Sequence, residues 1–279
     1  MLALLEKLKE NARFDGKEKS AITSQHAIWQ RSVRQVCKQN VPCAARAVAG
    51  RKSLYEWADR NHTSSLQPIP PADEIASTIR KAIVGIESPA RKSSMEEGSS
   101  GSGVVVGNRA ILTNCHVVNE LGRDHIVIDW DGKKHRVASI RGNAIFDLCL
   151  LTVPTLPDRT PAALAPFSGF NVGSRVYSFG NPLGATRTFS AGIVSAVRAQ
   201  MANPKDALRS GVARYISIQH DAVCEPGSSG GAVLDESGRL IAVMAYKQEG
   251  RINYAIPIQF FAYLPKSGVL PGEPFYMQE

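Results

Sequence analysis

The sequence predicts a mainly β protein that carries a small α-helical segment at its N-terminus. Residues 1–65 space apolar residues among charged ones at helical intervals. After Lys81 the chain changes to about a dozen short apolar stretches separated by turn residues, a pattern typical of a barrel or sandwich. The 16 prolines and 23 glycines also favour short strands and turns over long helices.

This change of pattern divides the chain into four segments. They are a helical segment, a proline-rich linker, a strand-rich domain and a C-terminal tail: 1–65, 66–73, 74–266 and 267–279. Within the first segment, residues 27–58 predict a helical hairpin. The motif Pro-Pro-Ala-Asp-Glu at 70–74 indicates a helix start, because proline suits the first turn and acidic residues favour it.

The predicted strands follow one another through the rest of the chain. They are 82–86, 103–107, 110–114, 125–130, 135–140, 148–153, 174–179, 189–197, 215–219, 231–234, 240–246 and 252–258. Legible turns separate several of them, among them Asp131-Gly132, Gly142-Asn143 and Glu249-Gly250.

Composition and charge restrict the partners that we expect. The content of 43% hydrophobic and 21% charged residues is ordinary for a soluble globular protein. The formal charge of +8 is spread along the chain without a basic block, so we expect no nucleic-acid partner. No stretch approaches the roughly 18 apolar residues that a membrane span requires, so we expect no membrane span.

The cysteines form an odd set of five: Cys37, Cys43, Cys115, Cys149 and Cys224. Cys37 and Cys43 flank a short loop that a disulfide could close, which would imply an oxidising compartment; two unpaired thiols are the alternative. The other three stand in apolar runs, and we interpret them as buried small hydrophobic residues. No cysteine–histidine spacing resembles a zinc site, so we expect no metal.

The first residues, M-L-A-L-L-E-K-L-K-E-N, predict an amphipathic helix and are too short and too charged for a secretory signal. A signal could have been removed before this numbering begins. We favour a periplasmic or secreted location, and a cytoplasmic location is the alternative because the sequence shows no signal peptide.

Three modest signals indicate nucleophilic chemistry when they are taken together. His116 stands at the end of an apolar strand, Asp147 stands inside an otherwise apolar strand, and residues 226–231 read P-G-S-S-G-G before another strand. Each has a plain structural explanation: a core histidine, an exposed strand-edge carboxylate and a flexible turn. In the order His, Asp, Ser they are the parts of a catalytic triad, in which imidazole takes the serine proton and the carboxylate orients the ring.

The glycines of this turn have a chemical use. Gly227 permits a backbone conformation in which successive N–H groups point at one spot, where a developing oxyanion would lie. Residues 98–103, G-S-S-G-S-G, have a similar composition but no comparable base or carboxylate beside them. We expect those residues to form a loop.

The second half of the chain resembles the trypsin-like serine peptidases, in particular the bacterial HtrA/Deg type. The resemblance extends over about residues 75–265 in unbroken order, and it is carried by G-S-G-V-V-V, T-N-C-H-V-V, F-D-L-C-L-L, V-G-S-R-V-Y-S-F-G-N-P-L-G, F-S-A-G-I-V-S-A-V, Q-H-D-A-V-C-E-P-G-S-S-G-G-A-V-L-D and Y-A-I-P-I. It implies a chymotrypsin-like double β-barrel, with two six-stranded barrels and the active site in the cleft between them. No cofactor is implied.

The resemblance also implies roles for individual residues. The G-x-S-G-G motif makes Ser229 the nucleophile, with His116 as general base and Asp147 as its orienting partner. The N–H groups of Gly227, Ser228 and Ser229 would form the oxyanion hole. The first barrel would supply His116 and Asp147, and the second would supply Ser229.

Two features depart from the family pattern. Cys115 and Cys224 stand where small or aliphatic residues are usual, which makes redox sensitivity worth testing. The chain ends shortly after Y-A-I-P-I-Q-F-F-A-Y-L, so we expect no PDZ domains in it.

The residues that would contact substrate are predicted from the same resemblance. Val223, six residues before Ser229, stands at a position that often forms the base of the specificity pocket, and a valine there argues against a preference for Arg or Lys. Four more residues lie on segments expected to form the pocket wall: Met244, Tyr246, Lys247 and Ile252. We expect an apolar or small residue before the scissile bond, although Lys247 leaves acidic substrates open.

The sequence thus predicts a serine endopeptidase that acts through an acyl-enzyme on unfolded or exposed segments of protein or peptide substrates. The alternatives are a catalytically silent protease-like binding scaffold and a latent protease held off by the N-terminal segment. That segment is either a helical cap on the protease or a relative of lysozyme-inhibitor-like periplasmic modules, which it resembles at Trp29, Cys37, Cys43 and Arg51.

Overall fold

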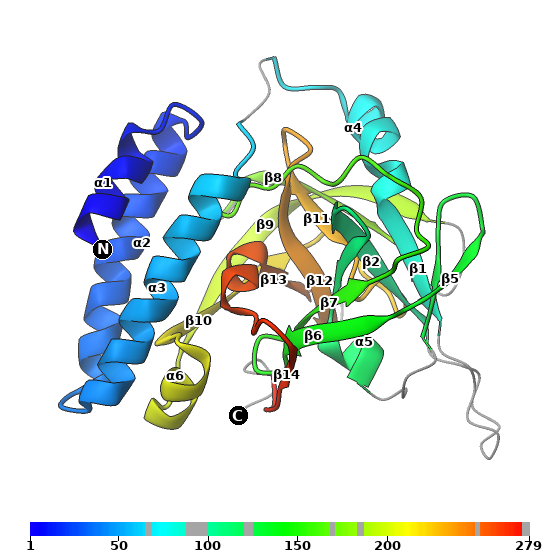
Figure 1. The fold of residues 1–279 in the computed structure, drawn as a ribbon. Coiled ribbons are helices and arrows are strands. Elements are labelled where there is room, and N and C mark those ends of the chain that lie inside the picture. Colours follow the sequence, from blue (N-terminus) through cyan, green and yellow to red (C-terminus); the bar gives the residue numbers. More distant parts are fainter. Residues whose placement is uncertain are drawn as a thin grey trace.

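The computed structural model describes residues 1–64, 68–87, 100–119, 125–167, 171–182, 187–248 and 252–274. Three N-terminal helices lie side by side along one flank of a β-rich body (Figure 1): α1 (Leu2–Glu10), α2 (Gly16–Cys37) and α3 (Val41–Asn61). Among the described residues, no helix is both long and apolar enough to cross a membrane.

Local capping explains where the long helices begin. The Asp15 side chain accepts a hydrogen bond from the Glu18 N–H, and the Glu18 carboxylate accepts one from the Asp15 N–H. Asn40 caps α3 by accepting from the Cys43 N–H at 2.9 Å. The predicted hairpin is therefore present, although it extends beyond 27–58 at both ends, and a disulfide joins Cys37 to Cys43 across its loop.

The remaining helical elements are short. They are α4 (Ala72–Ile79), η1 (Arg80–Ala82), α5 (Cys115–Asn119), α6 (Pro204–Ser210) and η3 (Ile258–Tyr263). The helix α4 begins after Pro71, as the Pro-Pro-Ala-Asp-Glu motif predicts. The helices α5 and α6 were not predicted.

The first sheet has eight strands in the order β14-β6-β7-β3-β2-β1-β4-β5. Its strands are β1 (Ile83–Glu87), β2 (Ser100–Gly107), β3 (Ala110–Thr113), β4 (Ile126–Ile128), β5 (Lys134–Arg136), β6 (Ser139–Asn143), β7 (Leu148–Thr152) and β14 (Gly268–Leu270). The expected closed barrel of six strands is wrong for this half. Residues 268–270, expected in a C-terminal tail, pair parallel with β6 instead.

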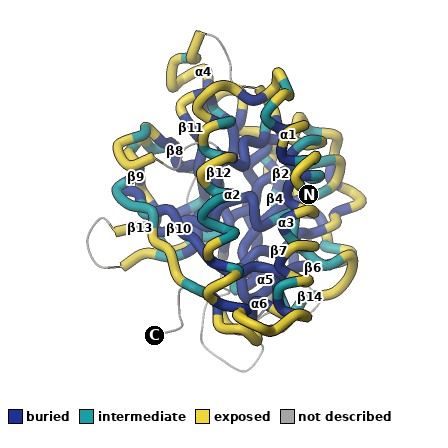
Figure 2. Tube along the Cα trace, turned by 90° about the vertical axis from the view of Figure 1, so that its left-hand side faces the viewer, coloured by how far each residue is buried: buried dark blue, intermediate teal, exposed yellow. Residues whose placement is uncertain are grey.

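The second sheet closes into a barrel in the order β10-β13-β12-β11-β8-β9. Its strands are β8 (Arg175–Gly180), β9 (Thr188–Met201), β10 (Arg214–His220), β11 (Ala232–Asp235), β12 (Leu240–Gln248) and β13 (Ile252–Pro257). Figure 2 shows that buried residues run through most strands of both halves, whereas many residues of the loops and of the helices are exposed. The predicted double β-barrel architecture is confirmed in this form, with one closed barrel and one open sheet.

Buried ion pairs connect the N-terminal helices to the closed barrel. Arg239 pairs with Glu18 of α2 at 3.0 Å and with Asp235 of β11 at 2.8 Å, and all three residues are buried. Breaking a buried ion pair by removing one partner leaves an uncompensated charge, which is strongly destabilising. The helical segment is therefore an integral part of the folded body.

Candidate active site

The structure brings His116 and Asp147 into direct contact. His116 lies on α5, the short helix that follows β3. Its Nδ1 is 2.7 Å from Oδ2 of Asp147, and its backbone N–H donates to Oδ1 of the same carboxylate at 2.9 Å. The carboxylate is almost completely buried, whereas 36% of the His116 side chain is exposed. A carboxylate held at Nδ1 leaves the opposite ring nitrogen, Nε2, as the one that can act as a base.

Asp147 is held by its backbone as well as by its side chain. It lies in the turn before β7, with a φ of 55°, so the expectation that it lies inside a strand is wrong. Its carbonyl oxygen accepts from Nδ2 of Asn114 at 2.9 Å and from the N–H of Cys115 at 3.3 Å. A left-handed conformation is uncommon for a residue other than glycine and persists where surrounding contacts enforce it.

A disulfide joins the segments that carry these two residues. Cys115 directly precedes His116, Cys149 stands two residues after Asp147, and their sulfur atoms are bonded. The interpretation of Cys115 and Cys149 as separate buried thiols is therefore wrong. Cys224 remains a buried free cysteine, and burial raises the pKa of its thiol to about 12, so it is not a nucleophile at neutral pH.

The Ser229 turn requires glycine at its tightest points. Gly227 and Gly230 have φ values of 91° and 87°. A Cβ on Gly230 would overlap the carbonyl oxygen of Ser102 and the hydroxyl of Thr113. A Cβ on Gly231 would lie 2.5 Å from Cε of Met244. The glycines thus allow the turn to lie directly against the first sheet.

Ser102 makes this connection between the two halves, and sequence reasoning missed it. Its N–H donates to the Ser229 carbonyl oxygen at 2.7 Å, and its hydroxyl donates to the Gly227 carbonyl oxygen at 2.7 Å. The same hydroxyl accepts from the Asn181 N–H at 2.8 Å. Residues 100–103 therefore form part of β2 rather than a loop; residues 98 and 99 lie outside the described part of the chain. The sequence signal that could have identified Ser102 was the motif G-S-G-V-V-V, in which Ser102 is the serine.

Two N–H groups of the turn are available to an oxyanion. The N–H groups of Gly227 and Ser229 have no acceptor within the part of the chain that the structure describes. Ser228 differs from the expectation, because its N–H donates to the Glu225 carbonyl oxygen at 2.8 Å. The Ser229 hydroxyl donates to the carbonyl oxygen of Ala245 at 2.8 Å, so its single proton is directed at β12 rather than at His116.

The five residues predicted to contact substrate have different environments. Val223 is 43% exposed and Ile252 is 37% exposed, whereas Met244 is buried beneath the turn. Tyr246 stacks on Tyr254 with ring centroids 4.5 Å apart, and burial raises the pKa of its hydroxyl to about 12.

Lys247 carries the positive charge on which a preference for acidic substrates would depend. Its ammonium lies 2.6 Å from the carboxylate of Glu225, four residues before Ser229. The cation is therefore already paired, which weakens its attraction for an acidic substrate.

Several known proteins are similar to this chain. Periplasmic pH-dependent serine endoprotease DegQ of Escherichia coli is 32% identical over 145 residues, which cover 51% of this chain and 30% of DegQ. Serine protease Do-like HtrA of Bacillus subtilis is 31% identical over 172 residues, which cover 58% of this chain and 37% of that protein. The chain thus spans well under two thirds of the length of these curated relatives.

Solved structures share the fold. The HtrA-type protease AlgW, solved with a tripeptide, superposes with a TM-score of 0.55 and 29% identity, covering 67% of this chain and 60% of that one. A serine endoprotease from Yersinia pestis superposes with a TM-score of 0.54 at 24% identity, covering 67% of this chain and 62% of that one.

The family match covers the region that contains the site. Residues 101–243, about half of the chain, match the family described as the trypsin-like peptidase domain. This region includes His116, Asp147 and the Ser229 turn, and it contributes most of the strands of the sheet and the barrel described above. The chain therefore belongs to the trypsin-like peptidase family.

Proposed function

We propose that the protein is a serine endopeptidase that uses His116, Asp147 and Ser229 as its catalytic triad. The observation that carries this proposal is the 2.7 Å contact between Nδ1 of His116 and the buried carboxylate of Asp147. The second barrel supplies a glycine turn with Ser229 at its centre, and Ser102 ties that turn to the first sheet. This arrangement supports acyl transfer through a serine nucleophile.

The first step requires a rotation of the Ser229 side chain. In the described conformation its hydroxyl donates to the Ala245 carbonyl oxygen. Rotation about χ1 directs the hydroxyl at Nε2 of His116, which takes the proton as the serine oxygen attacks the scissile carbonyl carbon. The imidazolium that forms is stabilised by Asp147.

The remaining steps use the same groups. The N–H groups of Gly227 and Ser229 stabilise the oxyanion of the tetrahedral intermediate. His116 then gives its proton to the departing amine, which leaves an ester between Ser229 and the acyl half of the substrate. Water, activated by His116, hydrolyses this ester and regenerates the serine hydroxyl.

We propose unfolded or exposed segments of proteins as substrates, with a small or apolar residue before the scissile bond. Val223 supplies no carboxylate for a basic side chain, and Lys247 is paired with Glu225. The names of DegQ and Do-like HtrA, a serine endoprotease and a serine protease, agree with a protein substrate.

We also propose a periplasmic or other oxidising location. Two disulfides, Cys37–Cys43 and Cys115–Cys149, support this proposal, because disulfides persist chiefly outside the reducing cytoplasm. The name of the similar protein DegQ of Escherichia coli includes the word periplasmic.

A fluorophosphonate probe tests the nucleophile. We expect labelling of the parent protein at Ser229, no labelling of Ser229→Ala, and retained labelling of Ser228→Ala, the adjacent serine. Hydrolysis of unfolded casein should fall by several orders of magnitude in Ser229→Ala. Labelling of Ser229→Ala at the parental rate, or a folded parent that neither labels nor cleaves, would contradict the proposal and favour a silent scaffold.

A peptide library tests the substrate preference. Mass spectrometry of the products should show cleavage after small or apolar residues. Cleavage chiefly after Arg or Lys would contradict the proposal that Val223 disfavours a basic residue before the scissile bond.

A further inference from the structure

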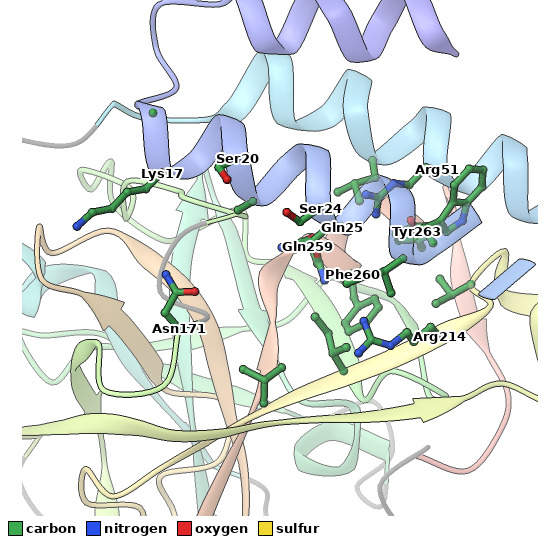
Figure 3. Close-up of a pocket in the computed structure, with 18 residues that line it drawn as sticks. Lys17, Ser20, Ser24, Gln25, Arg51, Asn171, Arg214, Gln259, Phe260 and Tyr263 are labelled. Atoms are coloured by element: carbon green, nitrogen blue, oxygen red, sulfur yellow. The ribbon is translucent and has the colours of Figure 1, made fainter. Parts of the chain in front are cut away.

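A cavity separate from the proposed active site lies between the N-terminal helices and the outside of the closed barrel. It encloses about 630 Å³, and its walls come from α2, α3, β9, β10 and η3 (Figure 3). Ligand cavities commonly have volumes of roughly 300–1,000 Å³. The cavity shares no residue with the His116, Asp147 and Ser229 site. Exposed side chains such as Lys17 and Ser20 line its outer part, so it is open to solvent.

Arg51 places a buried positive charge in the wall of this cavity. The residue is only 5% exposed, and its guanidinium lies over the rings of Tyr55 and Trp29, at 4.8 Å and 5.8 Å. Its guanidinium interacts with the phenol groups of Tyr55 and Tyr263, but its Nε and Nη2 atoms are buried without a hydrogen-bond partner, and within the described ranges of the chain no carboxylate pairs with it. A buried cation without a counter-ion is costly, so a bound anion would be strongly favoured.

The other charged residues in the wall of the cavity are also positive. Lys17 and Arg214 also line the cavity, and none of its described lining residues is an aspartate or glutamate. Figure 3 shows Arg51 on the helix side and Arg214 on the strand side of the same end. Burial lowers the pKa of Arg214, which is half-buried on β10, without making it neutral at physiological pH.

Two further polar atoms specify more than a negative charge. Among the residues that the structure describes, no donor reaches the buried Oε1 atom of Gln259, a residue that is 5% exposed, and no acceptor reaches the buried Nε1 atom of Trp29. A peptide group supplies both missing partners, because its N–H can donate to Gln259 and its C=O can accept from Trp29. A simple fatty acid would supply neither beyond its carboxylate.

The remaining wall is apolar and suits aliphatic side chains. It includes Ile28, Leu54, Val197, Ile216 and Phe260. A ligand that fills this space therefore combines a carboxylate, at least one peptide group and an apolar side chain.

We propose that this cavity binds the carboxyl-terminal end of an apolar peptide, with its carboxylate on Arg51 and Arg214. Peptide hydrolysis creates such ends, so products and damaged chains both carry the group that the cavity fits. The binding site itself does not depend on the identity of the catalytic nucleophile.

Titration calorimetry with N-acetyl-Leu-Leu and its C-terminal amide tests this proposal. The full-length Ser229→Ala chain is used so that the peptides are not consumed, and binding should occur there whether or not Ser229 is the nucleophile. We expect the free acid to bind at least about tenfold more tightly than the amide, because only the acid pairs with the arginines. Equal affinity of the acid and the amide would overturn the proposal.

Three variants, each made in the Ser229→Ala chain, locate the binding. Arg51→Met should weaken the free acid about tenfold or more and remove its advantage over the amide, and Arg214→Gln should weaken it severalfold. Ala21→Phe, on the α2 wall, should reduce binding by filling the cavity while leaving the cations in place. Arg175→Gln, an exposed arginine at the start of β8, is the matched control and should leave affinity unchanged.

The controls decide between this site and others. Circular dichroism and thermal melting confirm that each variant is folded; if Arg51→Met does not fold, Arg214→Gln and Ala21→Phe still carry the test. Unchanged acid binding in the folded variants would place the peptide elsewhere and overturn the proposal. Dodecanoate that binds more tightly than the peptide, with loss in Arg51→Met, would overturn the assignment of a peptide ligand.

Discussion

The N–H of Ser102 donates to the carbonyl oxygen of Ser229 at 2.7 Å, so a strand of the first sheet holds the Ser229 turn of the closed barrel. The Ser102 hydroxyl adds a second bond, to the Gly227 carbonyl oxygen. Gly230 then packs against the Ser102 carbonyl, where no side chain fits. We therefore expect Ser102 to help set the position of the Ser229 turn relative to His116 and Asp147 in the proposed site.

Ser102→Ala tests this connection. The variant loses the hydroxyl that donates to Gly227 and accepts from Asn181, and each buried partner left unsatisfied costs about 1–3 kcal/mol. We expect the free energy of unfolding to fall by this order and kcat/KM to fall about tenfold or more, because the turn can shift relative to His116. Ser217→Ala, a buried serine of β10, is the control. Equal effects of the two substitutions on kcat/KM would show that Ser102 has no positioning role.

Gly230→Ala tests the geometry of the turn. Its φ of 87° is unfavourable for alanine, and the added Cβ would overlap Ser102 and Thr113. We expect loss of fluorophosphonate labelling and a fall of about 3 kcal/mol or more in the free energy of unfolding.

Gly132→Ala is the matched control for the effect of φ alone. Its φ is 81°, but a Cβ there would meet no atom within 4 Å. A loss of about 1 kcal/mol with retained labelling is expected. Similar behaviour of the two variants would mean that the contact with Ser102 contributes nothing.

Reduction of Cys115–Cys149 should impair catalysis. The bond ties the segments of His116 and Asp147 across a sequence separation of 34 residues, and loop closure of this size contributes about 3–4 kcal/mol to stability in the chain-entropy treatment. The double variant Cys115→Ala/Cys149→Ala should therefore melt at lower temperature and hydrolyse peptides more slowly.

The Cys37–Cys43 bond supplies the comparison, because it lies in the α2–α3 loop and is not part of the site. Cys37→Ala/Cys43→Ala should retain the parental kcat/KM. If the parent loses activity in dithiothreitol, the Cys115→Ala/Cys149→Ala variant should show no further loss. Full parental activity in that variant would contradict the prediction.

Acidification should destabilise the protein through His220. This histidine is fully buried in β10, and burial lowers its pKa from 6.5 to about 4. Between these two values the unfolded chain binds a proton that the folded barrel rejects, so the free energy of unfolding falls as the pH falls from 6.5 towards 4. The full effect is about 3 kcal/mol.

Urea unfolding at several pH values measures this effect. His220→Leu should flatten the pH dependence of the free energy of unfolding between pH 7 and 4. The pKa of His26 is also lowered by burial, but His26 is present in both proteins, so the difference between the two curves isolates His220. Parallel curves would show that His220 does not titrate as proposed.

Local patterns predicted most of the secondary structure. Short apolar runs located most strands of both halves, and the Pro-Pro-Ala-Asp-Glu motif located α4, but the predicted strand 135–140 is divided between β5 and β6, and β14 was not predicted. The helix α6 was missed although its signals were present: Asn203 at the N-cap, Pro204 in the first turn and Gly211 at the C-cap with a φ of 74°. At seven residues it was too short to show a helical period among strands.

The sequence by itself determined the order of the elements and the residue types that could carry chemistry, because helix periods, strand alternation and glycine turns are encoded over a few neighbouring residues. Only the tertiary structure decided that Cys115 bonds to Cys149, that Asp147 adopts a turn with a positive φ, that the Ser228 N–H is occupied, and that Ser102 holds Ser229. It also decided that Arg51 is buried against a cavity without a carboxylate partner among the described residues. These features depend on contacts between segments far apart in the chain, and no local pattern specifies which distant groups will meet when the apolar faces pack together.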